Sequence, residues 1–276
     1  MWTLKAWQGR FVEHPLAAGE RLRAYAGWCN AVEGNTTFYA TPSRETVATW
    51  AAQTAEDFRM VLKLPRPVTH EQRLAAATSP ELTAFLDAIE PLGPRAYALW
   101  IQLPSSFGPP DVPALDAFLR RLPQRYSTAV EVRHNAFFAE RDAERRLEDV
   151  LSAHGAEWVP FDTTAFFAAA PTSDAERDAW TKKPRTPLRS RALTQRPIVR
   201  YLGRDDTTET VRGWQRWVAI AAEWLREGRS PTFFIHTPDN ADAPRLARDF
   251  HAAVRARVPD LAPLPDPEPV GPLTLF

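Results

Sequence analysis

The feature that most constrains the fold is an alternation of short apolar runs with longer amphipathic stretches along most of the chain. Seven runs are rich in Val, Ile, Leu, Phe and Trp and are bounded by Pro, Gly, Asn or Asp, which is typical of β-strands. They cover residues 30–34, 58–64, 96–103, 128–133, 157–162, 197–202 and 232–237. Strands that alternate with helices form βαβ units, so the sequence predicts a parallel sheet.

The stretches between these runs have the spacing of one-sided helices. Leu82, Phe85, Leu86 and Ile89 recur at i, i+3, i+4 and i+7, which places them on one helix face. Ser43 follows a proline and is a typical N-cap residue. The expected helices cover residues 16–28, 43–53, 80–92, 112–122, 141–153, 210–226 and 240–254.

The number and length of these units favour a TIM (β/α)8 barrel with its first strand, expected within residues 1–7, short or altered. A doubly wound sheet is the alternative, but no G-x-G-x-x-G or Walker A motif follows an early strand. Residues 163–196 have no clear helical period, so an irregular segment is expected in place of a regular helix after the sixth strand. We expect a single barrel domain over 1–258 and a Pro-rich C-terminal tail over 259–276.

Charge and cysteine content exclude several classes of function. Lys plus Arg and Asp plus Glu both number 34, so the net charge is zero and a broad nucleic-acid-binding surface is not expected. No apolar run approaches the roughly 20 residues that span a bilayer, and the N-terminus has no apolar signal region, so a cytoplasmic protein without a membrane partner is expected. Cys29 is the only cysteine, which excludes an internal disulfide and a cysteine-based zinc site.

Polar side chains stand at the end of all seven predicted strands, directly after the apolar residues. Charged groups are almost never fully buried unless they are paired, so this repetition demands an explanation. In a TIM barrel the carboxyl ends of the strands meet at one mouth, which is where the active site lies. The residues that this pattern selects are Glu33, Asn35, Lys63, Gln102, Glu131, Arg133, His134, Asp162, Arg200 and His236.

Several motifs at these positions resemble the YecE-like family, known as domain of unknown function 72. The motifs are V-E-G-N-T-T-F-Y-A-T-P (32–42), F-R-M-V-L-K-L-P-R-P-V-T-H-E (58–71), I-Q-L-P-S-S-F (101–107), V-E-V-R-H (130–134) and I-H-T-P-D-N (235–240). The resemblance covers nearly the whole chain and implies a TIM barrel, but no activity. Of the family's opening pattern only W-Q-G-R-F (7–11) is recognisable. Besides the strand-end residues, the resemblance adds Thr37, Tyr39, Thr69, His70 and Asn240 to the expected site.

The residue types at this mouth are those of general acid–base catalysis. We expect an enzyme that hydrolyses or isomerises a small polar substrate, either anionic or polyhydroxylated. Glu131, His236, Asp162 and Lys63 are the expected catalytic residues. Arginine forks suit anionic groups, and amides and hydroxyls orient a polyhydroxylated ligand. The expected substrate-binding residues are Glu33, Asn35, Thr37, Tyr39, His70, Gln102, Arg133, His134, Arg200 and Asn240.

Two alternatives stay open at this point. The cofactor is unknown: a divalent metal could be held by Glu33, Glu131, Asp162 and His236, but there is no H-x-H or H-E-x-x-H motif and the neighbouring cations would repel it, so no metal site is predicted. The second is a non-catalytic barrel that binds a metabolite or a nucleic-acid fragment. Its nucleic-acid form would use a basic stretch beside aromatic residues, which a solvated loop explains better in a neutral chain. That stretch contains Lys182, Lys183, Arg185, Arg189 and Arg191, near Phe166, Phe167 and Trp180.

One further pattern has a structural interpretation. Trp214, Trp217 and Trp224 lie on one face of a predicted helix. Such a face could bind a partner, but packing against the body of the protein explains it more simply.

Overall fold

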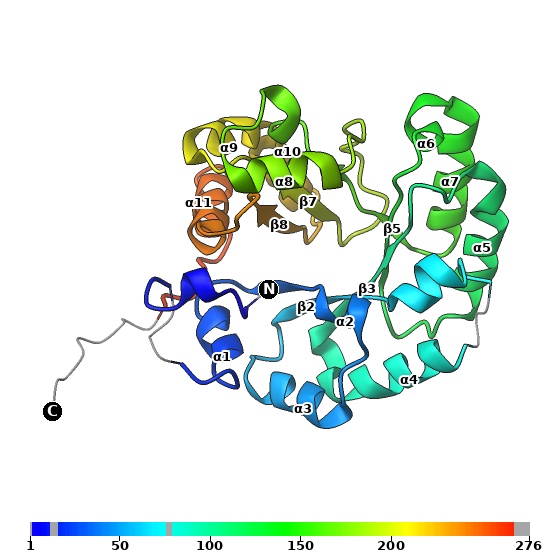
Figure 1. Cartoon of the computed structure of the whole chain (residues 1–276), viewed down its shortest axis with the longest axis horizontal. Helices are drawn as coiled ribbons and strands as arrows, with labels where there is room; N and C mark the ends of the chain where they lie inside the picture. Colours follow the sequence, from blue (N-terminus) through cyan, green and yellow to red (C-terminus); the bar gives the residue numbers. More distant parts are fainter. Residues whose placement is uncertain (1, 12–15, 76–78, 268–276) are drawn as a thin grey trace, which may run out of the picture.

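A computed structural model describes residues 2–11, 16–75 and 79–267, and its strands are parallel throughout. Five strands form one sheet in the order β1-β2-β3-β4-β5, and three form a second sheet in the order β6-β7-β8. Helices flank the strands on the outside, with α3, α4, α5 and α7 along the first sheet and α9, α10 and α11 beside the second (Figure 1). The strands are β1 Ala31–Gly34, β2 Arg59–Lys63, β3 Ala96–Gln102, β4 Thr128–Glu131, β5 Glu157–Trp158, β6 Phe161–Asp162, β7 Ile198–Leu202 and β8 Thr232–His236.

All seven predicted strands are confirmed, and one of them is divided. The run at 157–162 forms both β5 and β6, because Pro160 lacks the N–H that would continue a ladder. The backbone nevertheless links the two sheets here, since Val159 N donates to Val130 O at 2.8 Å and Arg200 N donates to Pro160 O at 3.0 Å. The first half of the predicted strand therefore pairs with β4 and the second half with β7.

The eighth strand expected within residues 1–7 is wrong for the part that is described, residues 2–7. A 3₁₀ turn, η1 Lys5–Trp7, stands there instead. Trp2 packs edge-on against Trp50 with centroids 5.3 Å apart, whereas Trp7 stacks on Tyr25 at 5.8 Å. Because Trp2 and Trp7 pack against different partners, the segment between them is bent rather than extended as a strand. Among the described residues no ladder joins β8 to β1, so a closed eight-stranded barrel is not present in the hydrogen-bond pattern.

The helices follow the predicted apolar stripes, with two differences. The helix expected at 210–226 is divided into α9 and α10 next to Gly213, where a Cβ atom would come within 2.4 Å of the Tyr201 hydroxyl. The segment predicted to be irregular contains the regular helix α8. The helices are α1 Arg21–Ala26, α2 Thr36–Tyr39, α3 Arg44–Ala52, α4 Pro80–Ile89, α5 Val112–Arg121, α6 Ala136–Ala139, α7 Arg141–Ala153, α8 Asp174–Lys182, α9 Thr207–Gly213, α10 Gln215–Arg226 and α11 Ala243–Arg255.

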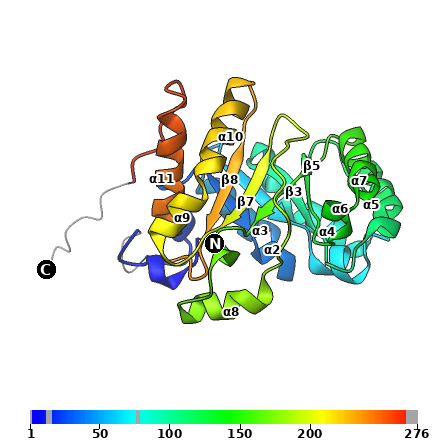
Figure 2. The same ribbon diagram turned by 90° about the horizontal axis from the view of Figure 1, so that it is seen from above.

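The periodicity did not reveal helix α8 because its apolar face is small, with Ala179 and Trp180 packed near Phe166, and polar contacts hold its N-terminal half. The side chain of Ser173 caps it by accepting a hydrogen bond from Glu176 N, and the Glu176 carboxylate accepts one from Thr172 N. Glu176 also forms a buried ion pair with Arg204 at 2.7 Å, which fastens the helix to the loop after β7. In Figure 2, α8 lies at the lower edge of the molecule, below β7 and β8.

Two kinds of core hold the strands in place. Outside the sheets, Trp214, Trp217 and Trp224 are buried against Phe233 and Phe250, which confirms the packing interpretation of the tryptophan face. The described part of the tail, 259–267, runs along α11, where Arg248 and Arg255 donate to the carbonyl groups of Pro265 and Leu261. Residues 268–276 of the predicted tail lie outside the described part. No helix in the described ranges has the length and apolar character that crossing a membrane requires.

Candidate active site at the carboxyl ends of the strands

The second core lies between the strands and is built by their period of two. Alternate residues of each strand point to the same side, and one buried apolar cluster contains Val61, Ala98, Trp100, Ala129, Val159, Ile198 and Phe234. Two residues further along the same strands the side chains are polar. Val61 is followed by Lys63, Ala129 by Glu131, and Phe234 by His236. The apolar layer therefore carries a polar layer at the carboxyl ends of the strands. We call this layer the polar cup and define it as Glu33, Lys63, Gln102, Glu131, Arg133, Arg200 and His236.

Glu33 at the end of β1 contacts three neighbours in the polar cup. Its Oε1 atom lies 2.8 Å from Lys63 Nζ and 3.3 Å from Arg200 Nη2. Its Oε2 atom lies 2.7 Å from His236 Nε2, so this pair bridges the space between β1 and β8. Burial disfavours the charged form, but Arg200, Lys63 and His236 outweigh it and hold the pKa of Glu33 well below its usual range. Glu33 is therefore an ionised carboxylate.

Glu131 at the end of β4 is the second carboxylate, and it is fully buried. Its Oε1 atom accepts hydrogen bonds from Arg133, with Nε at 2.8 Å and Nη2 at 2.7 Å. Its Oε2 atom forms only a long ion pair with Arg200 Nη1 at 3.9 Å and has no hydrogen-bond partner among the described residues. Burial acts to raise its pKa, but Arg133, Arg200 and Lys63 lower it below the usual range. A buried anion thus presents one free oxygen to the interior of the cup.

Arg200 on β7 connects the two carboxylates and is itself incompletely bonded. Its guanidinium lies 4.5 Å from the centre of the Phe161 ring and 5.8 Å from that of Trp100. Its Nε atom, like Nε1 of Trp100, is buried without a hydrogen-bond partner in the described part of the chain. Buried polar atoms are paired in the great majority of cases, so unpaired ones facing a single cup mark a place for a polar ligand or water.

Lys63 on β2 is a buried amine with a perturbed pKa. Its Nζ atom donates to Gln102 Oε1 at 2.9 Å and lies 4.9 Å from the Trp100 ring centre. Burial, reinforced by the neighbouring Arg200 charge, lowers the pKa of Lys63 to about 8 despite the two carboxylates. An amine that titrates near neutral pH is able to exchange protons with a substrate.

His236 on β8 is a neutral imidazole at neutral pH. Burial lowers its pKa, against the opposing influence of Glu33. Its single ring proton lies on Nε2 and is donated to Glu33, because an ionised carboxylate has no proton to give. Nδ1 lies 3.0 Å from the position of Oδ1 of Asn240, a residue with a positive φ of 56°. Because the neutral ring accepts at Nδ1, the amide NH2 group of Asn240 is the one that donates to it. Asn240, one of the predicted substrate-binding residues, thus lies against His236 of the cup.

The electrostatic balance of the polar cup favours anions. Three cations, Lys63, Arg133 and Arg200, face the two carboxylates Glu33 and Glu131. A fourth cation, Lys183 of the segment after α8, feels the same charges: its pKa is lowered by burial and then by Arg200. Sequence reasoning placed Lys183 in a basic loop and not in the site. The Pro184 carbonyl accepts a hydrogen bond from the Thr163 hydroxyl, and the Thr186 hydroxyl donates one to the Phe161 carbonyl. These two contacts tie the segment that contains Lys183 to the end of β6.

Five other predicted residues have local partners outside the polar cup or are exposed. The Thr37 hydroxyl lies 2.7 Å from Lys63 O and 2.8 Å from Gly34 O and so ties β1 to β2. Tyr39 is 78% exposed, and the side chain of the half-buried Asn35 has no hydrogen bond to another described residue. His134 Nδ1 accepts from Ala136 N at 3.2 Å.

The fifth of these residues, Asp162, is committed to the fold. Its Oδ2 atom accepts a hydrogen bond from Trp217 Nε1 at 2.7 Å, and its Oδ1 atom accepts one from Thr164 N at 2.8 Å. Sequence reasoning missed both partners, and it treated Trp217 as apolar packing alone. The sequence did contain a signal for the first contact, because Trp217 lies on the helix face nearest the sheet and Asp162 is a carboxylate at a strand end.

His70 lies at the rim in the π-helical turn η2 Pro67–Glu71. Its Nδ1 atom is 2.9 Å from the neighbouring Thr69 hydroxyl, and its ring packs edge-on against Phe38 at 5.0 Å. Burial and then the charge of Arg133 lower its pKa to about 4, so it is neutral at physiological pH and offers a hydrogen bond rather than a charge.

The donor set does not suit a metal ion. In the described part of the chain no three His, Cys, Asp or Glu side chains are grouped to hold one. Glu33 and Glu131 each contact an arginine, and Asp162 is occupied by Trp217 and a backbone amide. The proposed metal ligands are therefore already paired with cations or donors.

The basic stretch near α8 is likewise paired within the protein. Arg189 and Arg191 both contact Glu148, Lys182 pairs with Asp178, and Arg185 stacks over Phe167 and Trp180. These contacts explain the basic residues without a nucleic acid.

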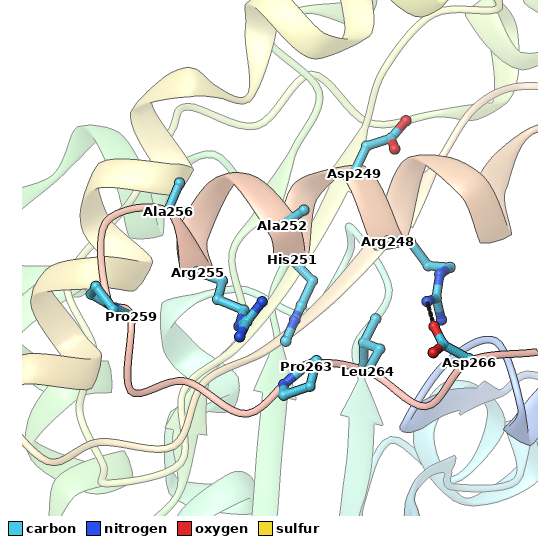
Figure 3. A pocket seen from close by; sticks show the side chains of 10 residues that line it. All are labelled: Arg248, Asp249, His251, Ala252, Arg255, Ala256, Pro259, Pro263, Leu264 and Asp266. Carbon is cyan, nitrogen blue, oxygen red and sulfur yellow. Dashed lines mark ion pairs between the residues drawn. The ribbon is translucent and has the colours of Figure 1, made fainter.

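One sizeable hollow lies away from the polar cup. A hollow of about 650 Å³ opens between α11 and the tail, and Figure 3 shows His251 and Arg255 on one side of it with Pro263 and Leu264 on the other. Its walls contain neither a carboxylate–lysine cluster nor a strand end, so its size alone does not make it the site. Cys29, at the opposite end of β1 from Glu33, is buried and its pKa is raised to about 11, which argues against a cysteine nucleophile.

Fold and site together define a class: an α/β protein with parallel strands and a buried, mixed-charge cup at their carboxyl ends. The chain belongs to the family described as protein of unknown function DUF72, whose model matches residues 1–269. It is 39% identical over 244 residues to the UPF0759 protein YecE of Escherichia coli O157:H7, covering 88% of this chain and 89% of that protein, and it matches YecE of strain K12 to the same extent.

Two crystal structures of a DUF72 family protein from Enterococcus faecalis V583 share the fold. One has a TM-score of 0.63 at 20% identity and covers 87% of this chain and 94% of its own. The other has a TM-score of 0.67 at 18% identity and covers 95% and 97%. The family is thus shown from sequence and its fold from structure, and neither comparison names an activity.

Proposed function

We propose that this protein is an enzyme that uses the polar cup for acid–base catalysis on a small anionic substrate, with hydrolysis and isomerisation both compatible with its residues. The observation that carries the proposal is the set of unpaired buried atoms, Glu131 Oε2 and Arg200 Nε, in a layer where cations outnumber carboxylates. By contrast, both oxygens of the structural carboxylate Glu176 accept hydrogen bonds within the protein. A polyhydroxylated substrate with a phosphate or carboxylate group fits both the arginines and the amide of Gln102.

The roles follow from the protonation states. Arg200, Arg133 and Lys183 bind the anionic group, Glu131 is the base through its free oxygen, and Lys63 with its lowered pKa is the acid. Asn240 orients His236, which in turn holds Glu33. Asp162 acts as a positioning residue for the β6 end, and His70 lines the rim.

The same proposal extends to the fold and location. The strands share an interior layer of inward-facing side chains in the manner of a TIM barrel, and we propose that β1 and β8 close it through the contact between Glu33 and His236 rather than through a backbone ladder. A cytoplasmic location and a single domain over 1–258 stay predictions.

Anion binding is tested by thermal unfolding in inorganic phosphate against sodium chloride of equal ionic strength. We expect phosphate to raise the melting temperature of the wild type, since a ligand at 100 times its Kd stabilises by about 2.7 kcal/mol. The variant Arg200→Met should lose this rise. The matched control is Arg59→Met, which removes a half-buried arginine at the amino end of β2, where it bonds Ser230 and Thr232. Equal phosphate stabilisation of wild type and Arg200→Met would contradict the proposal.

Catalysis is tested by screening phosphorylated sugars and small phosphoesters for hydrolysis and isomerisation. On any substrate that is turned over, Glu131→Gln should reduce kcat at least 100-fold, because a general base contributes about 10²–10⁴. Glu157→Gln is the control: this carboxyl group is also buried on a neighbouring strand, but it bonds Thr194 away from the cup. Phosphate binding that depends on Arg200, together with no turnover of any substrate, would make the protein a binding module instead.

A further inference from the structure

Lys63 differs from the other lysines of the chain in being an amine enclosed by the protein. The sequence has four lysines, and Lys63 is 4% exposed, whereas Lys5 and Lys182 lie on the surface. Its stem runs inward from β2, and its Nζ atom reaches Glu33, Gln102 and the Trp100 ring. An ammonium group is not held in such a place without a use for its nitrogen.

The partners of Lys63 match a neutral amine better than an ammonium ion. An ammonium group has three N–H donors, and two acceptor atoms lie near Nζ among the described residues: Glu33 Oε1 at 2.8 Å and Gln102 Oε1 at 2.9 Å. A neutral amine has two N–H groups, which these two oxygens accept, and its lone pair is then left unshared. The arrangement therefore presents a nucleophilic lone pair to the cup.

A neighbouring cation supports the neutral form. Arg200 contacts the same Glu33 oxygen as Lys63 does, so the two positive groups share one carboxylate. Burial and this like charge lower the pKa of Lys63 to about 8, which leaves roughly one-tenth of the amine neutral at pH 7. A desolvated lysine beside another cation is the usual form of an activated amine nucleophile.

We propose that Lys63 forms a Schiff base with the carbonyl group of a small aldehyde or ketone that carries a phosphate or carboxylate group. This inference rests on the proposed function, because Arg133, Arg200 and Lys183 are the groups that bind the anionic end. It narrows the substrate class to carbonyl compounds and gives Lys63 the role of nucleophile in place of that of acid.

The step balances with the groups in the cup. The Nζ lone pair forms a C–N bond to the carbonyl carbon, and the C=O π pair moves to oxygen. Ionised Glu33, 2.8 Å from Nζ, takes a proton from nitrogen and returns it to that oxygen, giving a carbinolamine. The C–O bond then breaks as nitrogen forms C=N⁺, and one further proton from solvent completes the departing water. Glu131 Oε2, which is free of hydrogen bonds within the described residues, is the base that removes a proton from the adjacent carbon.

The test is reductive trapping on the full-length wild-type protein with dihydroxyacetone phosphate and with pyruvate, each in the presence of sodium borohydride. Hydride adds to the iminium carbon and makes a stable secondary amine, which peptide mass spectrometry assigns to one lysine. We expect Lys63 to be modified at least 10-fold faster than Lys182, the internal control, which is exposed and pairs with Asp178. Trapping at Lys63 should rise with pH around 8, and it should be lost in Lys63→Arg. Arg200→Met should shift this pH profile upward.

The outcomes separate this proposal from the proposed function. Equal modification of Lys63 and Lys182 by both probes, while phosphate still raises the melting temperature in an Arg200-dependent way, would overturn the Schiff base and leave the acid–base proposal standing. Absence of both trapping and phosphate stabilisation would overturn both. Trapping that is selective for Lys63 but unchanged by free phosphate as a competitor would overturn the part of the proposal that assigns an anionic group to the substrate.

Discussion

Two buried carboxylate–guanidinium pairs in this protein differ in how completely their polar atoms are used. Glu176 in α8 accepts hydrogen bonds from two backbone N–H groups and a hydroxyl group in addition to Arg204. Glu131 in the polar cup accepts from Arg133 with one oxygen, and the other oxygen has no hydrogen bond in the described ranges. The chemical groups are the same, and both carboxylates are fully buried.

The difference lies in the two carboxylates, and it separates a structural pair from the pair that we propose to be functional. A buried carboxylate is costly unless it is paired and its remaining lone pairs are satisfied, and Glu176 meets this condition because both of its oxygens accept hydrogen bonds within the protein. Around Glu131 the protein leaves polar atoms unsatisfied, and such an arrangement is retained where a ligand supplies the missing partners. The two pairs therefore predict opposite responses to mutation.

The largest expected effect is on stability, at the satisfied pair. Removing one partner of a buried ion pair typically costs about 3–5 kcal/mol, so Arg204→Met should lower the free energy of unfolding by about that amount. Arg200→Met should cost about 1 kcal/mol or less, since it removes a like-charge contact with Lys63 and leaves each carboxylate one cation, Lys63 for Glu33 and Arg133 for Glu131. Urea denaturation of both variants measures the difference.

The distinction between the two pairs fails if Arg200→Met destabilises the protein as much as Arg204→Met does. A loss at Arg200 that equals or exceeds the loss at Arg204 would mean that the cup is a structural network like the α8 anchor. Phosphate added to the same denaturation series sharpens the result, because it should stabilise Arg204→Met and leave Arg200→Met unchanged.

The next largest effect is the pH dependence that Lys63 imposes on stability. The folded pKa of about 8 lies below 10.5, the ordinary value of a lysine in an unfolded chain. Between these values the unfolded state binds more protons, so Lys63 makes stability rise with pH through this window. The cost of burying the charged amine is fully present below pH 8 and is lost above pH 10.5. A shift of this size corresponds to about 3 kcal/mol.

Subtracting the free energies of unfolding of Lys63→Met from those of the wild type separates the contribution of Lys63 from those of the other titrating groups. Free energies of unfolding for wild type and Lys63→Met are measured from pH 7 to 10.5, and their difference should change by about 3 kcal/mol in favour of the wild type. A flat difference would show that Lys63 keeps an ordinary pKa, which would also remove its nucleophilic role. The Glu176–Arg204 pair should add no pH dependence to the free energy of unfolding between pH 7 and 10.5, since carboxylates and guanidinium groups do not titrate there.

The sequence predicted the elements whose signal is apolar periodicity. Helix α7 was placed at its observed bounds, 141–153, because Ala143, Leu147 and Leu151 mark its buried face. The strand ends that form the polar cup were selected for the same reason, since Lys63, Glu131 and His236 interrupt an otherwise apolar run at a fixed place. Where burial alternates with a fixed period, the residues themselves carry the pattern.

The failures occur where polar contacts between distant segments decide the structure. Helix α8 has only a small apolar face and is held by Glu176 and Arg204, which are separated by 28 positions in the chain. The segment that contains Lys183 is tied back to the end of β6 by the Thr163–Pro184 hydrogen bond, and no local spacing encodes that contact. The absent first strand is a similar case, because Trp2 and Trp7 pack on different partners.

The smallest expected effect concerns Asp162, which shares its position at a strand end with Glu131 but has the saturated bonding of Glu176. Its two oxygens accept from Trp217 Nε1 and Thr164 N, so Asp162→Asn replaces one acceptor by an amide nitrogen that cannot accept. The loss of one hydrogen bond to a charged group should lower stability by about 1–2 kcal/mol. Phosphate stabilisation should be retained, since Arg200 and Glu131 are untouched. Urea denaturation with and without phosphate measures both. If Asp162→Asn abolished the phosphate effect while the variant stayed folded, Asp162 would be a binding residue of the cup, and saturation of hydrogen bonds would no longer distinguish structural from functional carboxylates in this protein.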